Sequence, residues 1–216
     1  SQLMSVPYAL FAKTADSLTK GIHGLSDADG NTKIQVEENP NEDVIRFDMA
    51  GTEFFKMDNG KLEVLNTGRS VFVGEGAGAN DDLNDNQNVA IGVAALEENT
   101  DRGPLVAIGD SALFNNGVGA TQFWYGTENT ALGSKSLFSN TEGFSNTATG
   151  FESMESNTTG FRNTANGYRS LYSNTTGERN TAFGSQSLFL NTSGYSNTAI
   201  GYLAMYTNDE GFDNTS

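Results

Sequence analysis

The pentapeptide Asn129-Thr130-Ala131-Leu132-Gly133 opens a stretch of sequence that repeats every 17 residues to the end of the chain. The same N-T-A-x-G marker returns at residues 146–150, 163–167, 180–184 and 197–201. A second marker, N-T-x-G, lies between the first ones at residues 140–143, 157–160, 174–177 and 191–194. A short, fixed period with two turn signals per unit is typical of a solenoid, in which each repeat forms one coil.

Each 17-residue unit predicts a flattened coil. Asn and Gly tolerate positive φ, and Asn and Thr side chains bond to nearby backbone groups, so every N-T cluster indicates a corner. Two corners per unit leave two short extended segments. One position is tiny (Ala131 and its equivalents), one is small (Ser136 and its equivalents), and one is large and apolar. We expect the large residues to fill the interior as its structural core: Leu137, Met154, Leu171, Leu188 and Met205.

Weaker copies of the marker extend the solenoid toward the N-terminus. Residues 106–109 (V-A-I-G) and 88–92 (N-V-A-I-G) are two earlier coils, and residues 71–74 (V-F-V-G) are a degenerate first coil. This gives eight coils marked by a glycine, from Gly74 to Gly201. The expected fold class is therefore all-β, with a parallel β-solenoid (β-roll) over residues 70–216. Because the chain stops within a unit, we expect the repeats to continue in a longer protein.

The unit buries little apolar surface for the amount of backbone that it orders. One buried Leu or Met contributes about 1.5–3 kcal/mol, whereas fixing each backbone residue costs about 1–2 kcal/mol. Hydrogen bonds between coils and ladders of stacked Asn and Thr recover part of this deficit. We expect the rest to come from burying one face against other copies of the chain, so the sequence predicts a homo-oligomer.

The residues before the repeats predict two smaller parts. Residues 1–20 are expected to form an extended and helical connector, with a short helix from Pro7 to about Leu18, because proline suits the first helical turn. Residues 21–69 are expected to form a small antiparallel β domain, since four alternating segments are separated by turn residues. Those segments are residues 32–36, 43–49, 53–57 and 61–65. Its expected role is to join the helix to the solenoid and to help set the register of the chains.

One interruption of the period carries the single tryptophan of the chain. Ala107 and Ala131 are 24 residues apart, seven more than the period, and the extra residues fall around residues 117–126. Insertions in solenoids form loops on one face. The aromatic triplet Phe123, Trp124 and Tyr125 is therefore a candidate binding patch. The structural alternative is that the loop folds back and caps a local gap.

Two acidic stretches are candidates for a calcium site. Residues 27–31 (D-A-D-G-N) resemble the start of a calcium loop, but the glycine comes too early for an EF-hand, and a plain turn is the simpler interpretation. The second stretch places Asp81, Asp82 and Asp85 close together in the sequence. Their carboxylates could bind calcium, and the alternative is a solvated acidic loop.

Composition and charge exclude several classes of function. The formal net charge of −15 disfavours nucleic acid and anionic lipid surfaces as partners. The sequence contains no apolar run long enough to span a membrane, so no membrane insertion is expected. It also contains no cysteine, which suits a secreted protein. His23 is the only histidine and lies outside the repeats.

Catalysis is not expected from this chain, because no nucleophile–base pair, phosphate loop or zinc spacing is present. A hexapeptide acyltransferase has coils of similar length, but it needs three apolar corners and usually a catalytic histidine within the coils. A sugar-cleaving tailspike needs paired carboxylates on one face, and the repeats hold few acids. Ice binding through stacked threonines is a lesser alternative. It is disfavoured because the threonines follow Asn at the predicted corners and do not alternate as T-x-T.

The N-[T/V]-A-I-G marker with its following S/A-L pair resembles the head repeats of trimeric autotransporter adhesins. That resemblance implies a left-handed β-roll and a trimer, although a higher cyclic number or a filament stays open. The longer unit with N-T-T-G, together with residues 5–15 (S-V-P-Y-A-L-F-A-K-T-A), resembles large secreted surface proteins of gliding and marine bacteria. Both resemblances imply an extracellular adhesive or structural fibre, whose partner would be a host or prey cell surface or a glycan. A phage or contractile-injection tail fibre is the alternative.

Overall fold

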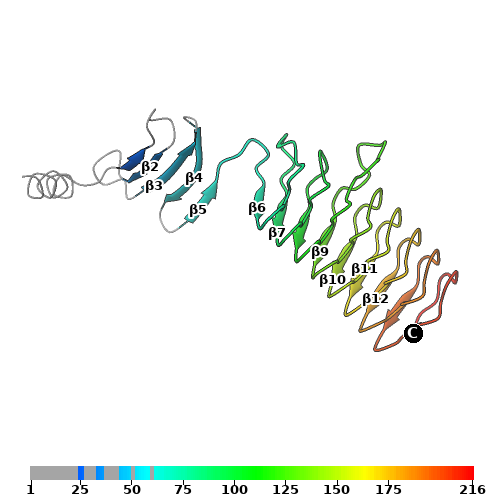
Figure 1. Ribbon diagram of the computed structural model, residues 1–216. Helices are drawn as coiled ribbons and strands as arrows, with labels where there is room; N and C mark the ends of the chain where they lie inside the picture. Colours follow the sequence, from blue (N-terminus) through cyan, green and yellow to red (C-terminus); the bar gives the residue numbers. More distant parts are fainter. Residues whose placement is uncertain (1–23, 27–32, 37–43, 50–51, 59–60) are drawn as a thin grey trace, which may run out of the picture. The chain divides into compact units, whose positions relative to one another are not determined.

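The chain divides into two compact units, Ser1–Asn66 and Thr67–Ser216, as the computed structural model in Figure 1 shows. The structure describes residues 24–26, 33–36, 44–49, 52–58 and 61–216. The predicted helix over residues 7–18 lies outside this set, and the described residues contain no helix. The division between the units lies three residues before the one predicted at residue 70.

The first unit contains a five-stranded antiparallel sheet, in which neighbouring strands follow one another along the chain. Its strands are β1 (Gly24–Ser26), β2 (Lys33–Val36), β3 (Val44–Met49), β4 (Thr52–Asp58) and β5 (Lys61–Val64). The four predicted strands are present, and β1 adds a fifth at the edge, paired with β2. The register of β3 against β4 shifts between Phe47 and Asp48, as in a β-bulge.

The second unit is a parallel β-solenoid of eight coils, which confirms the predicted fold class. Each coil contributes one three-residue strand to a single eight-stranded sheet: β6 (Val71–Val73), β7 (Val89–Ile91), β8 (Val106–Ile108), β9 (Thr130–Leu132), β10 (Thr147–Thr149), β11 (Thr164–Asn166), β12 (Thr181–Phe183) and β13 (Thr198–Ile200). Equivalent residues of the marker pair with one another, so that Ala148 lies between Ala131 and Ala165. The 17-residue period of the sequence is therefore the register of the sheet.

The second half of each coil differs from the prediction of two extended segments. The strand is followed by a continuous run of turns, and in it Lys135 and Leu137 have positive φ angles of 56° and 52°. In this segment residues with positive and negative φ alternate, and the backbone N–H groups point along the solenoid axis toward the neighbouring coils. The Leu137 N–H accordingly donates to Ser153 O of the next coil over 3.0 Å. The run of turns is thus joined to the neighbouring coils by backbone hydrogen bonds, as the strand is.

The interior holds the residues that the sequence predicts. The alanines at the centre of strands β7 to β13 are fully buried, as are Leu137, Met154, Leu171 and Leu188. Met205 is only half-buried and packs on the edge of this core, because it lies in the last coil of the sequence. The small serine beside each large residue is also fully buried, and Ser153 Oγ lies 3.0 Å from Ser170 Oγ of the next coil.

A column of buried asparagines, the first residues of the N-T-A-x-G markers, stabilises one corner of the solenoid. Asn146 shows the pattern: its N–H donates to Asn129 Oδ1 over 3.0 Å and its Nδ2 to Gly160 O over 2.8 Å. Its own Oδ1 accepts from both the N–H and the Nδ2 of Asn163. Because each side chain supplies the acceptor that the next backbone N–H needs, these buried polar groups are satisfied without water.

A second asparagine column runs through the N-T-x-G markers. Asn157 Nδ2 donates to Asn140 Oδ1 over 2.8 Å, and Asn174 Nδ2 donates to Asn157 Oδ1 over the same distance. Each of these amides also donates within its own coil, as Asn157 does to Gly160 O. The asparagines that the sequence marks as turn residues therefore act as two continuous ladders that join coil to coil.

Glycine is required where successive coils meet at the end of each strand. Gly150 has a φ of 127°, and a Cβ added to it would lie 2.5 Å from Gly167 O. Both the backbone conformation and the close approach exclude a side chain at this position. The marker glycine therefore sets how closely the coils can stack.

Candidate binding surface

The insertion between β8 and β9 forms a loop that leaves the sheet undisturbed. Ala107 still pairs with Ala131 across the 24 residues that separate them, so the additional residues do not alter the register. The two ends of the loop lie side by side, since a Cβ on Gly126 would be 3.1 Å from Gly117 Cα. The prediction of an insertion loop at residues 117–126 is confirmed.

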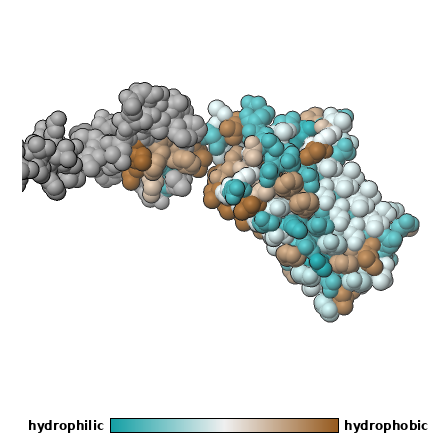
Figure 2. All heavy atoms as spheres, viewed as in Figure 1, coloured by the Kyte–Doolittle hydropathy of each residue, from teal (hydrophilic) through white to brown (hydrophobic). Residues whose placement is uncertain are grey.

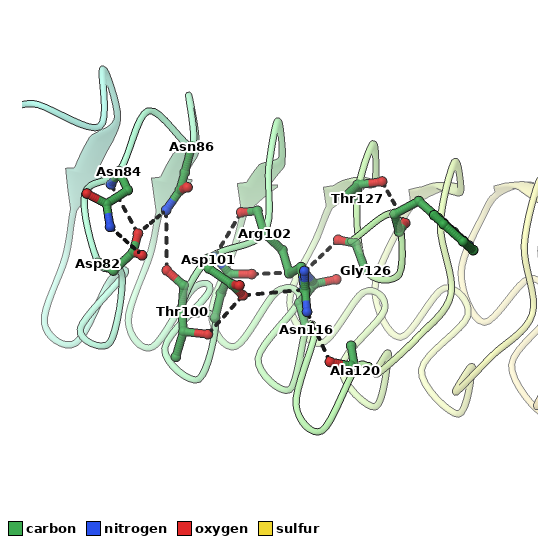
Figure 3. A network of polar contacts seen from close by, with 12 residues as sticks. Asp82, Asn84, Asn86, Thr100, Asp101, Arg102, Asn116, Ala120, Gly126 and Thr127 are labelled. Atoms are coloured by element: carbon green, nitrogen blue, oxygen red, sulfur yellow. Dashed lines mark hydrogen bonds and ion pairs between the residues drawn. The ribbon is translucent and has the colours of Figure 1, made fainter. Parts of the chain in front are cut away.

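The base of this loop is held by polar contacts from its own coil and from the preceding coil (Figure 3). Asn116 Nδ2 donates to Gly126 O over 2.8 Å, and Arg102 Nη2 donates to Ala120 O over 3.0 Å. Within the loop, the Thr127 hydroxyl donates to Trp124 O over 2.8 Å. A loop anchored in this way presents its tip in a defined position, which lowers the entropic cost of binding.

The three aromatic residues of the loop lie at its surface. Phe123 is 80% exposed and Trp124 is 42% exposed, while Tyr125 is half-buried. The rings meet edge to face, with centroids 4.8 Å apart for Phe123 and Trp124 and 5.8 Å apart for Trp124 and Tyr125. This exposure disagrees with the structural alternative of a loop that folds back to fill a gap. The triplet instead forms an exposed aromatic cluster.

Other aromatic residues of the solenoid are arranged differently. They stack face to face between successive coils, with centroids 4.8–5.8 Å apart and planes within 17° of parallel. The stacked pairs are Phe114–Phe138, Phe144–Phe161, Phe151–Tyr168, Tyr172–Phe189, Phe189–Tyr206 and Tyr195–Phe212. Stacking uses the ring faces to join coils and leaves mainly the ring edges to solvent. The aromatic loop thus differs from these columns, which are structural.

The acidic stretch before β7 is organised by amide donors. Asp81 accepts from the Leu83 N–H and from Asn86 Nδ2 through Oδ1, and from Asn88 Nδ2 through Oδ2. Asp82 accepts from the Asn84 N–H over 3.0 Å, and this hydrogen bond is the main cause of the lowered pKa of its carboxyl group. Such contacts satisfy the carboxylates in a compact loop.

Asp85 is turned to a different partner, an ion pair with Arg69 over 3.3 Å. The described residues hold no group of three or more acidic, histidine or cysteine side chains arranged to bind a metal ion. The carboxylates of Asp81, Asp82 and Asp85 thus bond to amides and to an arginine in this structure, and calcium binding there stays a prediction. Residues 27–31 and His23 lie outside the described part of the chain.

The outward side of the solenoid sheet shows a feature that the sequence analysis missed. The first and third residues of each strand point away from the interior, and in β6 to β8 all of them are valine, isoleucine or a similar apolar residue. In β10 and β11 the same positions hold threonine and asparagine. Figure 2 shows hydrophobic (brown) residues gathered over the first coils. This change can be read in the sequence: the strands read V-F-V and V-A-I in the first three coils and T-A-T in β10.

The threonines of the N-T-A marker begin the strands and do not lie at corners as predicted. Among the solenoid strands, β10 alone has the T-x-T pattern, through Thr147 and Thr149. Its neighbours have Leu132 and Asn166 at the third position. A flat threonine lattice of the kind that ice binding needs is therefore not formed by this sheet.

Comparison with protein-family models, curated protein sequences and solved structures finds no match to this chain. The fold itself places the second unit in the class of parallel β-solenoids. In the described part of the chain, no helix has the length and hydrophobicity of a membrane span.

Proposed function

We propose that this chain is a non-catalytic segment of an extracellular fibre that acts in surface attachment, with the aromatic loop as its contact site. One observation carries this proposal: the solenoid carries a seven-residue insertion, which forms an anchored loop that exposes Phe123 and Trp124 without altering the register of the sheet. A feature that contributes so little to the coils is not explained by folding alone.

The regular coils are suited to a supporting role. Their polar groups are satisfied by the next coil through the two asparagine ladders, so the solenoid can be lengthened by adding units without a new core. The repeated surface offers the same side chains many times, which gives little selectivity. Selective contact needs a break in the pattern, and the loop supplies it.

The chemistry of the loop favours a sugar or another weakly polar surface as its target. Exposed aromatic rings present apolar area together with the polar edges of Trp124 and Tyr125. The net charge of −15 opposes nucleic acid and anionic lipid. In a homo-oligomer the loop recurs around the axis, so weak contacts act together through avidity.

Attachment can be measured with beads coated with the purified chain, on cell surfaces and on immobilised polysaccharides. Trp124→Ala is expected to reduce bead retention at least several-fold while leaving the circular dichroism spectrum unchanged. Tyr202→Ala is the matched control, because Tyr202 is 73% exposed and lies outside the loop. Equal retention of the two variants, or no retention of the wild type on any surface, would refute the proposed function.

A further inference from the structure

The sheet of the solenoid has its small side chains inside and its larger apolar side chains outside, the reverse of an ordinary sheet with one buried face. Strands with one exposed face place large apolar residues inward and polar residues outward. Here the inward residue of each strand from β7 onward is an alanine, and the larger apolar side chains point out: Val71, Val73, Val89, Ile91, Val106, Ile108, Leu132, Phe183 and Ile200. We call these residues the outward face.

The outward face is uncharged and large enough to form a contact. Val73 is 55% exposed, Ile91 and Ile108 are each 38% exposed, and Ile200 is 64% exposed. Together its side chains present an apolar area on the order of 600 Å², divided into two parts by the polar residues of β10 and β11. Two such faces would bury roughly 1,200 Å² in total, which is the lower limit of a standard-sized specific interface.

We propose that the outward face binds the outward face of a second copy of this chain. This proposal rests on the homo-oligomer of the proposed function and names the surface that forms it; a contact between two identical faces closes at two copies, so it makes that oligomer a dimer in place of the trimer that the resemblance implies. The strands of a second copy have the same spacing, on the order of 4.8 Å. The valine and isoleucine side chains of each strand can therefore lie opposite those of the equivalent strand in the copy, along the whole sheet. The polar middle of the face, at Thr149 and Asn166, also meets a surface of matching size.

The absence of charged residues on the outward face favours an apolar partner, such as the same face of a copy of the chain, over a cationic one. The strands of β6 to β9 carry no charged residue, so a cationic partner would gain nothing from docking on them. Two chains of charge −15 repel one another at long range. Screening this repulsion with salt therefore strengthens self-association, whereas salt weakens the binding of a cationic partner.

The test is analytical ultracentrifugation of the full chain at micromolar concentrations, with and without added salt. Ile108→Lys buries a charge in the proposed contact and is expected to weaken association at least tenfold. Leu190→Lys is the matched control, because Leu190 is 39% exposed and lies in the run of turns after the strand, not in the sheet. It should leave association unchanged. Ile108→Thr, with the residue type found at Thr149, gives a second variant if the lysine disturbs folding.

A chemical test uses the absence of cysteine from the sequence. Ile108→Cys is expected to form disulfide-linked dimers under mild oxidation, whereas Leu190→Cys is not. A monomeric wild type at all concentrations and salts, or equal association of the two lysine variants, would overturn the proposal. Loss of self-association in Ile108→Lys with bead retention still dependent on Trp124 would separate this result from the proposed function.

Discussion

Removing one asparagine side chain from the first ladder should lower the free energy of unfolding of the solenoid by more than the small size of the side chain suggests. Asn163 is 1% exposed, and its Nδ2 donates to Gly177 O and to Asn146 Oδ1 over 2.8 and 3.2 Å. Its Oδ1 accepts from the Asn180 N–H over 2.9 Å. Asn163→Ala deletes all three hydrogen bonds and leaves the Asn180 N–H buried without an acceptor.

The expected loss follows from these contacts. The two donated hydrogen bonds contribute about 0.5–1.5 kcal/mol each, and a buried unsatisfied N–H costs about 1–3 kcal/mol. The free energy of unfolding should therefore fall by about 2–6 kcal/mol. Asn166→Ala is the matched control, since Asn166 lies in the same coil, points outward from β11 and makes no side-chain hydrogen bond in the described structure. Its effect should stay within about 0.5 kcal/mol.

Urea unfolding followed by circular dichroism gives the loss of stability, and amide hydrogen exchange locates it. The Asn180 amide should lose its protection in Asn163→Ala and keep it in Asn166→Ala. If the two substitutions lower stability equally, or if the Asn180 amide stays protected in both, the ladder does not stabilise the coils and the reasoning is wrong.

Leu171→Ala, at a fully buried position, should lower the free energy of unfolding by about 2–5 kcal/mol in denaturant titrations, and a loss below about 1 kcal/mol would place Leu171 outside the core. Gly150→Ala forces a Cβ against Gly167 O and should lower the midpoint of thermal unfolding by several degrees; an unchanged midpoint would show that the coils can separate there. Asp82 has a lowered pKa because the Asn84 N–H donates to it, so its contribution is present above its unfolded pKa and is lost as the pH falls through the folded one. Exchange of the Asn84 amide, corrected for intrinsic rates, should therefore lose protection in acid, and Asp82→Asn should remove that pH dependence.

The sequence predicts the coil and its interior because each repeated residue type has a local reason. Alanine at the centre of the marker and a large residue such as Leu137 leave room for one thin core, and both are buried as expected. The run of turns was not predictable in the same way. Lys135 and Leu137 have positive φ although neither side chain favours it, because hydrogen bonds from Lys135 to the preceding coil and from Leu137 to the next coil impose that conformation.

The candidate contact sites were predictable to different degrees. The 24-residue spacing between Ala107 and Ala131 locates the aromatic loop, but its exposure depends on anchors such as Arg102, which are distant in sequence. The outward face was visible in the changing third residue of the marker, from Ile108 to Thr149. The outward face is not predicted from the repeat, because the repeat is defined by its constant positions, whereas the residues of this face change from coil to coil.

Deleting residues 119–125 tests the central claim most directly, because it restores the 17-residue spacing between Ala107 and Ala131 and removes the aromatic loop in one step. The measurement is bead retention by this variant beside the wild type, with thermal unfolding recorded on the same samples. The account predicts a solenoid that still folds, with only a small fall in the unfolding midpoint because Arg102 loses its acceptor Ala120 O, and loss of retention to the level of uncoated beads. Retention equal to that of the wild type, or a solenoid that no longer folds, would contradict it.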